Sequence, residues 1–342
     1  MTDLARYQRQ IIYPPLGEAG QERLGRARAV VFGCGALGSS IANWLVRAGV
    51  GHLRLIDRDF VEITNLHRQT LFDEADAEAA LPKAVAAAEK LRRINRHVEI
   101  EPIVADLSAD NVESLLAGAD VAVDGTDNFE TRFLVNDAAL KLNLPWVYGG
   151  CVGMEGQSMT ILPGETPCLM CLLPECPPVG STATCDTAGV LGPIVGVISA
   201  IESGEALKIL AGRREAVSRH LVSIGLWDMR LRQIDVGHLR GESGCAACGR
   251  GEYRWLSGRE GAKAAVLCGR NSVQLTSEQG DLNLDELAER LRLAGQVKQN
   301  AFLVRLKAGE HELTVFADGR SIVSGTNDVA TARTLYARYI GC

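Results

Sequence analysis

The stretch from Val30 to Asp57, VVFGCGALGSSIANWLVRAGVGHLRLID, constrains the fold more than any other part of the sequence. It predicts an apolar strand, a helix over 36–48 that ends at Gly49, and a second strand over 52–57. Between the first strand and the helix comes a glycine-rich turn that contains Gly33, Gly35 and Gly38. These elements form one βαβ unit.

A glycine turn of this kind lets the backbone approach a nucleotide and directs a helix N-terminus at its phosphates. Asp57 ends the second strand, about 20 residues after the turn, where a carboxylate can hydrogen-bond a ribose hydroxyl. By itself the motif indicates only a nucleotide, and a redox dinucleotide fits it equally well. The alternative without a ligand is a tight strand–helix turn.

Strands and helices continue to alternate as far as residue 150, which predicts a mostly parallel, doubly wound, Rossmann-like sheet with helices on both faces. Ligands of such sheets bind beyond the carboxyl ends of the strands, where the glycine turn, Asp57 and Asp127 fall. Antiparallel strands are expected over 156–163 and 220–236. The other predicted strands are 98–106, 120–127 and 145–150, and the other helices begin at Lys83 and cover 111–119 and 128–143.

The chain has 342 residues, 46% of them hydrophobic, and a net charge of −6. This charge does not favour nucleic-acid binding. The N-terminus lacks the apolar core of a signal peptide, and the longest apolar run, 188–201, contains Pro193 and stops at Glu202. That run is too short to span a membrane and predicts a buried helix, so we expect a cytoplasmic protein.

The composition changes after the polar, glycine-rich segment near residue 260. We therefore expect a sheet domain over 1–250, a linker over 251–262 and a small α+β domain over 263–342. The order predicted for the small domain is β, α, β, β, β, α. Its last hairpin turns at Asp318-Gly319, a pair that tolerates positive φ at both central positions.

Two polar segments follow strands of the sheet domain. The first contains Asp57 and Asp59 at a strand end, then Asn65 to Gln69 (NLHRQ), with Lys83 opening the next helix. Arg68 in this segment is suited to a bidentate grip on phosphate, whereas Lys83 would act as a point charge. The alternative is that both are solvated surface cations.

The second polar segment, VDGTDN, places Asp124 and Asp127 at another strand end. A carboxylate there can hold Mg²⁺ against nucleotide phosphates. The alternative is helix capping by Asp127 or Asn128.

Two Cys-x-x-Cys pairs carry the most specific metal signal in the chain. Four thiolates satisfy a tetrahedral Zn²⁺ and leave no open position, so we expect a structural zinc site, in preference to free buried thiols or a redox pair. The ligands are Cys168, Cys171, Cys245 and Cys248. A further cysteine, Cys185, lies in a segment of small polar residues before Pro193, where it is either an accessible nucleophile or an ordinary loop residue.

Together these segments resemble the ubiquitin-activating superfamily in its bacterial form, the ThiF/MoeB/HesA adenylyltransferases. The resemblance spans residues 1–250. It rests on RYQRQI, GCGALGS, DRDFVEITNLHRQ, TDNFETR, CLMC, CDTAGVLGPIVGVI, EALK and CAAC, in the order of the family.

The resemblance implies that the protein uses Mg-ATP to adenylylate the C-terminal Gly-Gly carboxylate of a ubiquitin-like sulfur carrier, with a sulfurtransferase or cysteine desulfurase as a further partner. Arg9 is similar to the arginine that reaches into the partner subunit's ATP site, which implies a homodimer. Cys185 matches the thiol that joins covalently to the carrier in the ThiF branch. The resemblance assigns the nucleotide to the three turn glycines, Asp57, Asp59, Asn65, Arg68, Gln69, Lys83, Asp127 and Asn128, with Asp127 positioning Mg²⁺.

The sequence departs from the family where Ala36 replaces a frequent glycine, where Lys83 follows ALP, and in the tail after residue 262. Two other functions remain open at this point. An NAD(P)-dependent oxidoreductase uses the glycine turn but leaves Arg68, Lys83 and the four cysteines unexplained. A non-catalytic scaffold would not need such a complete set of ATP ligands. Within the superfamily, dehydration of a modified tRNA nucleoside is a further activity, which the acidic charge does not favour.

Overall fold

The computed structural model describes residues 4–177, 188–242, 244–260, 265–267, 271–275, 282–292 and 294–340. The chain divides into two compact units, each described here by itself: Met1–Pro178 with Ala183–Glu260, and Val179–Thr182 with Gly261–Cys342. Among the described residues, no helix is both long and apolar enough to cross a membrane.

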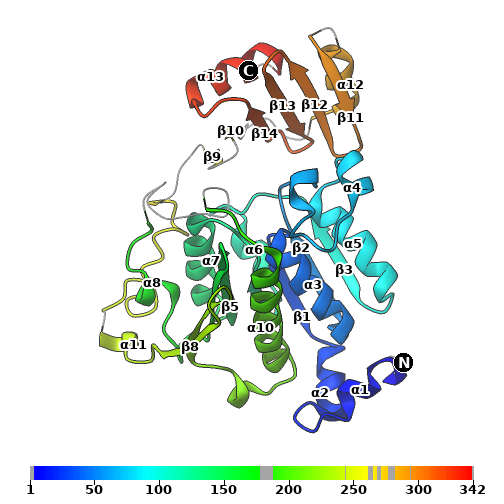
Figure 1. Cartoon of the computed structure of the whole chain (residues 1–342). Coiled ribbons are helices and arrows are strands. Elements are labelled where there is room, and N and C mark those ends of the chain that lie inside the picture. The colour runs from blue at the N-terminus through cyan, green and yellow to red at the C-terminus, as the bar shows by residue number, and fades with distance from the viewer. Residues whose placement is uncertain are drawn as a thin grey trace. The chain divides into compact units, whose positions relative to one another are not determined.

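The first unit contains an eight-stranded sheet in the order β3-β2-β1-β4-β5-β6-β7-β8 (Figure 1). The five strands from β3 to β5 run parallel, and β5 to β8 pair antiparallel. This confirms the predicted parallel sheet with an antiparallel extension. The strands are β1 (Arg28–Phe32), β2 (His52–Ile56), β3 (Glu99–Ile103), β4 (Val121–Asp124), β5 (Trp146–Val152), β6 (Glu155–Ile161), β7 (His220–Gly225) and β8 (Arg230–Asp235).

Helices cover both faces of this sheet. One core contains side chains of α3 (Ala36–Ala48), α5 (Lys83–Ile94) and α10 (Gly192–Leu210). The core on the other face contains side chains of α6 (Val112–Leu116), α7 (Phe129–Lys141) and α8 (Leu169–Leu172). The remaining elements of the unit are η1 (Leu4–Tyr7), α1 (Gln8–Ile11), α2 (Gly17–Leu24), η2 (Ile63–Asn65), α4 (Glu74–Glu78), η3 (Arg214–Ala216) and α11 (Leu239–Glu242).

Three local features show how the sequence sets these elements. Helix α3 ends at Ala48 because Gly49 adopts the left-handed conformation, with φ of 84°. Strand β3 is shorter than the predicted 98–106, and its Pro102 is tolerated because β3 is an edge strand. Helix α10 continues past Glu202, where the apolar run stops, because this residue is itself buried within the helix.

The second unit is a six-stranded antiparallel sheet in the order β11-β12-β13-β14-β10-β9. Its core joins the strands to α12 and α13. The predicted order lacked β10 and β11, two short strands rich in polar residues. The elements are β9 (Ala265–Leu267), β10 (Ser272–Leu275), α12 (Leu284–Leu291), β11 (Gln296–Gln299), β12 (Leu303–Ala308), β13 (His311–Phe316), β14 (Ser321–Ser324) and α13 (Val329–Tyr339).

The β13–β14 hairpin turns at the predicted place but by a different geometry. Of the two central residues, Gly319 has positive φ, at 81°, whereas Asp318 does not. The Asp318 carboxylate accepts a hydrogen bond from the Arg320 backbone N–H at 3.0 Å. This turn therefore needs positive φ only at Gly319, and not at both central positions as the sequence predicted.

Candidate functional site

The glycine turn follows β1 and lies where the strand order of the sheet reverses, between β1 and β4. Gly33 has φ of 82°, and a Cβ on it would lie 2.6 Å from the Gly125 carbonyl oxygen. A Cβ on Gly38 would overlap the Gly33 carbonyl oxygen, and one on Gly125 would do the same. These glycines are therefore explained by packing between the turns that follow β1 and β4.

Gly35 differs from its neighbours because a Cβ on it would meet other atoms only at ordinary contact distances. The atoms nearest to a Cβ at this position are the Gln69 Nε2, at 3.8 Å, and the Gly125 carbonyl oxygen, at 3.9 Å. Gly35 is partly exposed, is the N-cap of α3 and offers no capping side chain. The first N–H groups of α3 therefore have no side-chain cap, and this cradle suits a phosphate group.

Asp57 holds the loop after β2 against the glycine turn. Its carboxylate accepts hydrogen bonds from the backbone N–H groups of Cys34 and Asp59, both at 2.6 Å. Burial raises the pKa of Asp57, and the nearby Lys83 opposes this rise. Each carboxylate oxygen keeps a second lone pair, so both oxygens remain able to accept a ribose hydroxyl.

Lys83 and Asp59 form a buried ion pair beside Asp57. The Lys83 ammonium donates to Asp59 Oδ2 at 3.2 Å, and the Lys83 backbone N–H donates to the Asp59 carbonyl at 2.9 Å. A two-residue bridge between Phe60 and Pro82 brings the two segments together. The Lys83 ammonium therefore lies at the carboxyl edge of the sheet, and the Asp59 carboxylate balances its charge.

The segment Asn65 to Gln69 forms a tight turn, in which the Asn65 carbonyl accepts the N–H groups of Arg68 and Gln69 at 3.1 and 3.0 Å. Gln69 and Asn65 are buried. Within the described part of the chain, Gln69 Oε1 has no hydrogen-bond partner, although Gln69 Nε2 overlooks Gly35. This buried amide therefore lies beside the glycine turn with one hydrogen-bond acceptor unused among the described residues.

Arg68 lines a cavity of about 670 Å³ together with His67, Gly153, Leu191 and Trp227. Its guanidinium donates to the Thr64 carbonyl at 3.2 Å. The first residue of α10, Gly192, packs closely against the His67 backbone. The cavity therefore extends from the loop that carries Arg68 to the exposed turn between β7 and β8.

Two acids at the end of β4, Asp124 and Asp127, lie in different environments. Asp124 is fully buried, and its carboxylate accepts from Thr126 N at 2.8 Å and Arg132 Nε at 3.0 Å. Asp127 is exposed at the same end of the strand and remains available to a cation. Asn128 caps α7 by accepting the Thr131 N–H at 2.9 Å. Of the two residues that the sequence suggested as helix caps, Asp127 and Asn128, it is Asn128 that caps α7.

Arg132 and Glu202 are site residues that the sequence analysis missed. Arg132 also donates to the Thr126 carbonyl at 2.6 Å and to the Gly149 carbonyl at 3.0 Å. Glu202 is fully buried against Gly149, and burial together with the Asp124 carboxylate holds its pKa well above the usual range. The sequence gives little signal for either residue, because each is one of several charged residues on its helix.

The four predicted zinc ligands meet in one cluster. Their sulfur atoms all lie within 4.8 Å of one another. The distances between Sγ atoms are 3.8 Å for Cys168–Cys171, 3.6 Å for Cys168–Cys245 and 3.3 Å for Cys171–Cys248. A tetrahedral Zn²⁺ with bonds of about 2.3 Å requires sulfur atoms about 3.8 Å apart, so the four thiols fit this ion.

Helix α7 anchors both cysteine segments. Asn136 Oδ1 accepts the backbone N–H of Leu169, which follows Cys168, at 2.9 Å. The next residue, Asp137, accepts the N–H of Trp255 at 2.9 Å through Oδ2. The helix that begins after Asp127 therefore ties the cysteine cluster to the parallel half of the sheet.

Two further predicted residues take no part in these contacts as the structure describes them. Arg9 lies on α1 with an exposed side chain. Cys185 lies outside the described residues.

Comparison with known proteins agrees with this architecture. Residues 7–247 match the ThiF family. The sulfur carrier protein ThiS adenylyltransferase of Bacillus subtilis is 44% identical over 98% of this chain and 99% of its own. The sulfur carrier protein adenylyltransferase of Thermus thermophilus is 39% identical over 72% of this chain and 91% of its own. A crystal structure of E. coli MccB with ATP shares the fold, with a TM-score of 0.62, 24% identity, and coverage of 71% of this chain and 74% of that one.

This protein belongs to the ThiF family, since the match covers most of its length and a full-length relative is 44% identical. The family match ends at residue 247, before Gly261, where the longer segment of the second compact unit begins.

Proposed function

We propose that the protein uses ATP to adenylylate the C-terminal Gly-Gly carboxylate of a ubiquitin-like sulfur carrier. The observation that carries this proposal is the uncapped cradle at Gly35, with Lys83, Arg68 and Asp127 at the carboxyl ends of the strands around it, in a member of the ThiF family. A hydride-transfer enzyme has no use for this set of phosphate-binding groups.

The reaction requires little proton transfer. A carboxylate is ionised at neutral pH, so its oxygen attacks the α-phosphorus directly while the bond to pyrophosphate breaks, which gives an acyl-adenylate. The protein's task is alignment and charge neutralisation. In this proposal the α3 N-terminus with Asn65, Arg68 and Lys83 holds the phosphates, and Asp57 holds the ribose. Mg²⁺ would supply further positive charge when bound at Asp127.

Substitution at Gly35 tests the cradle. In Gly35→Ala, the new methyl group lies 3.8 Å from Gln69 Nε2, the nearest atom beyond its chain neighbours, but the backbone ψ of −145° lies outside the regions that alanine favours, so circular dichroism first establishes that the variant is folded. The methyl group would occupy the phosphate space, and we expect a rise in KM for ATP in carrier-dependent pyrophosphate exchange. Gly38→Ala is the contrasting variant, because its methyl group clashes with Gly33 and should impair folding. Unchanged ATP kinetics in folded Gly35→Ala would contradict the cradle.

Mass spectrometry of mixtures with Mg-ATP and candidate carriers tests the reaction itself. We expect an acyl-adenylate on a carrier that ends in Gly-Gly and none on a carrier shortened by the last glycine. Arg68→Ala and Asp127→Ala should both lose this product while staying folded, since Arg68 is half-buried and Asp127 exposed. Full activity in both variants would remove their assigned roles, and protection by NAD(H) in place of ATP would remove the function.

The exposed side of the β7–β8 hairpin supports docking of the carrier body. Trp227 and Leu231 are 81% and 68% exposed, and Met229 and Ile234 lie nearby on the same hairpin. Trp227 also lines the cavity that contains Arg68. A carrier seated on this apolar hairpin would have a short route for its tail into that cavity.

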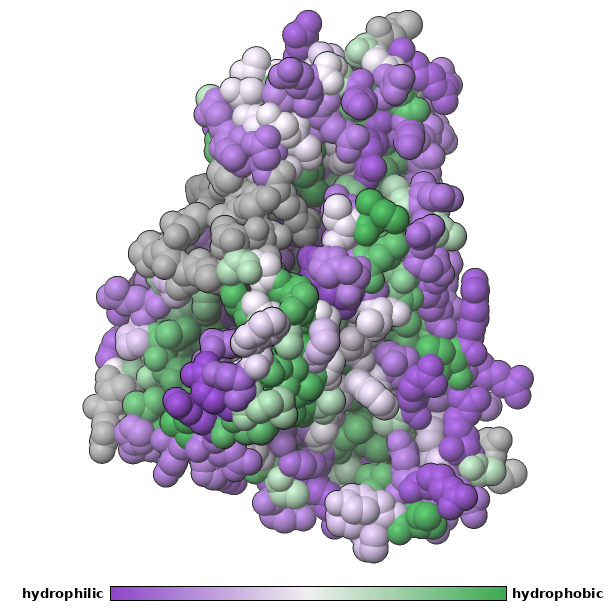
Figure 2. Space-filling model, in the orientation of Figure 1, coloured by the Kyte–Doolittle hydropathy of each residue, from purple (hydrophilic) through white to green (hydrophobic). Residues whose placement is uncertain are grey.

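We also propose a homodimer in which Arg9 completes the partner's ATP site. Helix α10 is apolar from Pro193 to Val197, and three small residues along it face open space or solvent: Gly196, Ala200 and Gly204. Figure 2 shows apolar side chains on the face where α10 lies. Mixing Arg9→Ala and Arg68→Ala proteins tests this proposal, because one heterodimer site would keep both arginines and regain activity. Absence of any regain after subunit exchange would contradict action across the dimer.

Four finer roles complete the proposal. Zn²⁺ at the four cysteines would be structural. Cys185 would join covalently to the carrier after adenylylation, so Cys185→Ser should still form acyl-adenylate but lose the covalent species. A sulfurtransferase or cysteine desulfurase would then supply sulfur. The second unit would recognise the carrier or regulate its access, and a chain truncated after residue 260 with unchanged carrier kinetics would contradict this role.

A further inference from the structure

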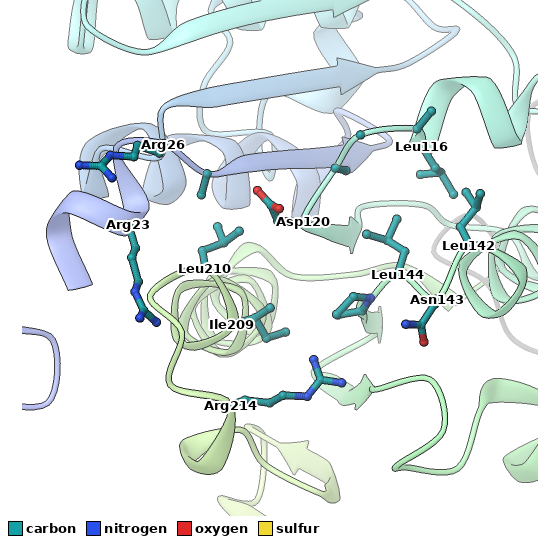
Figure 3. A pocket seen from close by; sticks show the side chains of 15 residues that line it. Arg23, Arg26, Leu116, Asp120, Leu142, Asn143, Leu144, Ile209, Leu210 and Arg214 are labelled. Carbon is teal, nitrogen blue, oxygen red and sulfur yellow. The ribbon is translucent and has the colours of Figure 1, made fainter. Parts of the chain in front are cut away.

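A second cavity of about 670 Å³ lies at the opposite edge of the first unit's sheet (Figure 3). It is formed where β1, β4 and β5 begin, between the end of α2, the loops that enter these strands, and the end of α10. Its lining residues all belong to the first unit. Ligands of doubly wound sheets bind at the carboxyl edge, so the nucleotide does not account for this cavity.

The floor of the cavity is apolar. Leu116, Leu144 and Leu210 line it and are almost completely buried, and Leu142 lies partly exposed at the rim. A hydrocarbon group placed on these leucines would leave water, which is favourable by about 25 cal/mol for each Å² of apolar surface.

The polar groups of the cavity are mostly positive. Three arginines line it against one acid, Asp120, and the Asp120 carboxylate already accepts the Arg28 backbone N–H at 2.8 Å. Arg26 lies 3.8 Å from Glu22 and points away from the cavity in Figure 3. The other two arginines, Arg23 and Arg214, flank the end of α10 in the same view.

Arg214 is held in a way that leaves part of its guanidinium available. Its Nε donates to Glu165 Oε1 at 2.7 Å, which orients the side chain. Figure 3 shows the group reaching toward the loop that carries Asn143. A guanidinium fixed through Nε presents its two terminal nitrogens in the fork that binds carboxylate or phosphate.

We propose that this cavity binds a small amphipathic anion, in which a carboxylate or phosphate lies on Arg214 and Arg23 and an aliphatic or aromatic body lies on the three leucines. The cavity is away from the nucleotide edge, so its occupation is independent of the adenylylation proposed above.

Calorimetric titration of the full chain, saturated with Mg-ATP to fill the nucleotide site, tests this proposal. The probes are phenyl phosphate and benzoate, with benzyl alcohol and benzylamine as neutral and cationic counterparts of similar shape. We expect at least one of the anions to bind at a single site, at least about tenfold more tightly than either counterpart. Equal binding of all four probes, or no binding of either anion at millimolar concentration, would overturn the proposal.

Arginine variants test whether the anion binds in this cavity. Arg214→Ala and Arg23→Ala should each weaken binding of the anion by about tenfold. Arg219→Ala is the matched control, because Arg219 pairs with the same Glu165, at 2.7 Å, but does not line the cavity. All three side chains are exposed, so the variants should fold. Affinity that is unchanged in Arg214→Ala, or lowered equally in Arg219→Ala, would show that the anion binds elsewhere.

Discussion

The two halves of the first unit's sheet obtain their shape in different ways. In the parallel half, each acid at a strand end accepts an N–H group two residues away, as Asp57 does from Asp59 and Asp124 from Thr126, and Asp57 also accepts the Cys34 N–H of the neighbouring strand's turn. In the antiparallel half, Cys168 and Cys245 meet although 77 residues separate them. Short-range bonds form wherever the strands do, whereas the cysteine cluster requires a cross-link between distant loops. The first half should therefore be sensitive to lost charges, and the second to loss of metal.

Loss of a cysteine ligand should have the largest effect. Structural zinc contributes on the order of 10 kcal/mol in small domains, so Cys245→Ser should abolish zinc binding and loosen the loops around α8 and α11. Elemental analysis of the purified protein measures the zinc content, and hydrogen exchange maps the loosening. Cys176→Ser is the control, because Cys176 lies outside the cluster and should keep the metal. Zinc retained in Cys245→Ser would contradict the assigned ligands.

Arg132→Ala should have the next largest effect, within the parallel half. It leaves the fully buried Asp124 without its cation, which typically costs about 3–5 kcal/mol of unfolding free energy. Urea denaturation measures this change. The exposed pair of Arg230 with Glu155 provides the comparison, and Arg230→Ala should cost less than about 1 kcal/mol. A similar loss in both variants would contradict the dependence on burial.

Removing both charges sharpens this comparison. In the double variant Arg132→Met with Asp124→Asn, no buried charge is left unpaired, so it should be more stable than Arg132→Ala. A double variant that is less stable would show that the hydrogen bonds of Arg132 to Thr126 and Gly149 outweigh its charge.

Asp137 joins the two halves and should make their connection depend on pH. Burial raises its pKa to about 6 from its usual value near 3.8, against the opposing hydrogen bonds from Trp255 and Leu256. The unfolded chain then loses this proton at lower pH than the folded chain, so stability falls as the pH rises through that window and is level above it.

Asp137→Asn keeps an oxygen acceptor and removes the titration. Relative to this variant, the native protein should lose about 2 kcal/mol of unfolding free energy between pH 4 and 6. Denaturant unfolding across this range measures the difference. Parallel pH profiles for the two proteins would contradict the shift.

Leu231→Ser should have the smallest effect on stability, below about 0.5 kcal/mol, because β8 is an exposed edge strand. If the carrier docks on the β7–β8 hairpin, its affinity should nevertheless fall. Calorimetry with the carrier measures this, and Arg232→Ser on the opposite side of the same strand is the control. Equal carrier affinity in all three proteins would remove the hairpin from the docking surface.

The sequence was sufficient to predict the alternating sheet domain because its strands and helices carry strong apolar periodicity. The bounds of α3 matched the prediction because Gly49 ends the helix by its own backbone preference. In the second unit, β10 and β11 were missed because SVQL and QVKQ carry too few apolar residues to indicate strands, and they are formed by pairing with β14 and β12.

The candidate site was predictable only where residues lie next to strand ends or in motifs. Arg132 and Glu202 were missed because a charge on a helix is ordinarily solvated, and only tertiary packing shows that both are buried beside Gly149. The packing that distinguishes Gly33 from Gly35 likewise depends on Gly125, in the turn after β4, which is distant in sequence.

Helix α7 has a mechanical consequence for the enzyme. Its N-cap is Asn128, the residue after Asp127, and its middle residues Asn136 and Asp137 accept the N–H groups of Leu169, which follows Cys168, and of Trp255, in the segment after Cys248. If Asp127 binds Mg²⁺ as we propose, loosening of the cysteine cluster should displace that carboxylate, because a helix is stiff along its axis. We therefore expect removal of zinc to lower nucleotide turnover before the sheet unfolds.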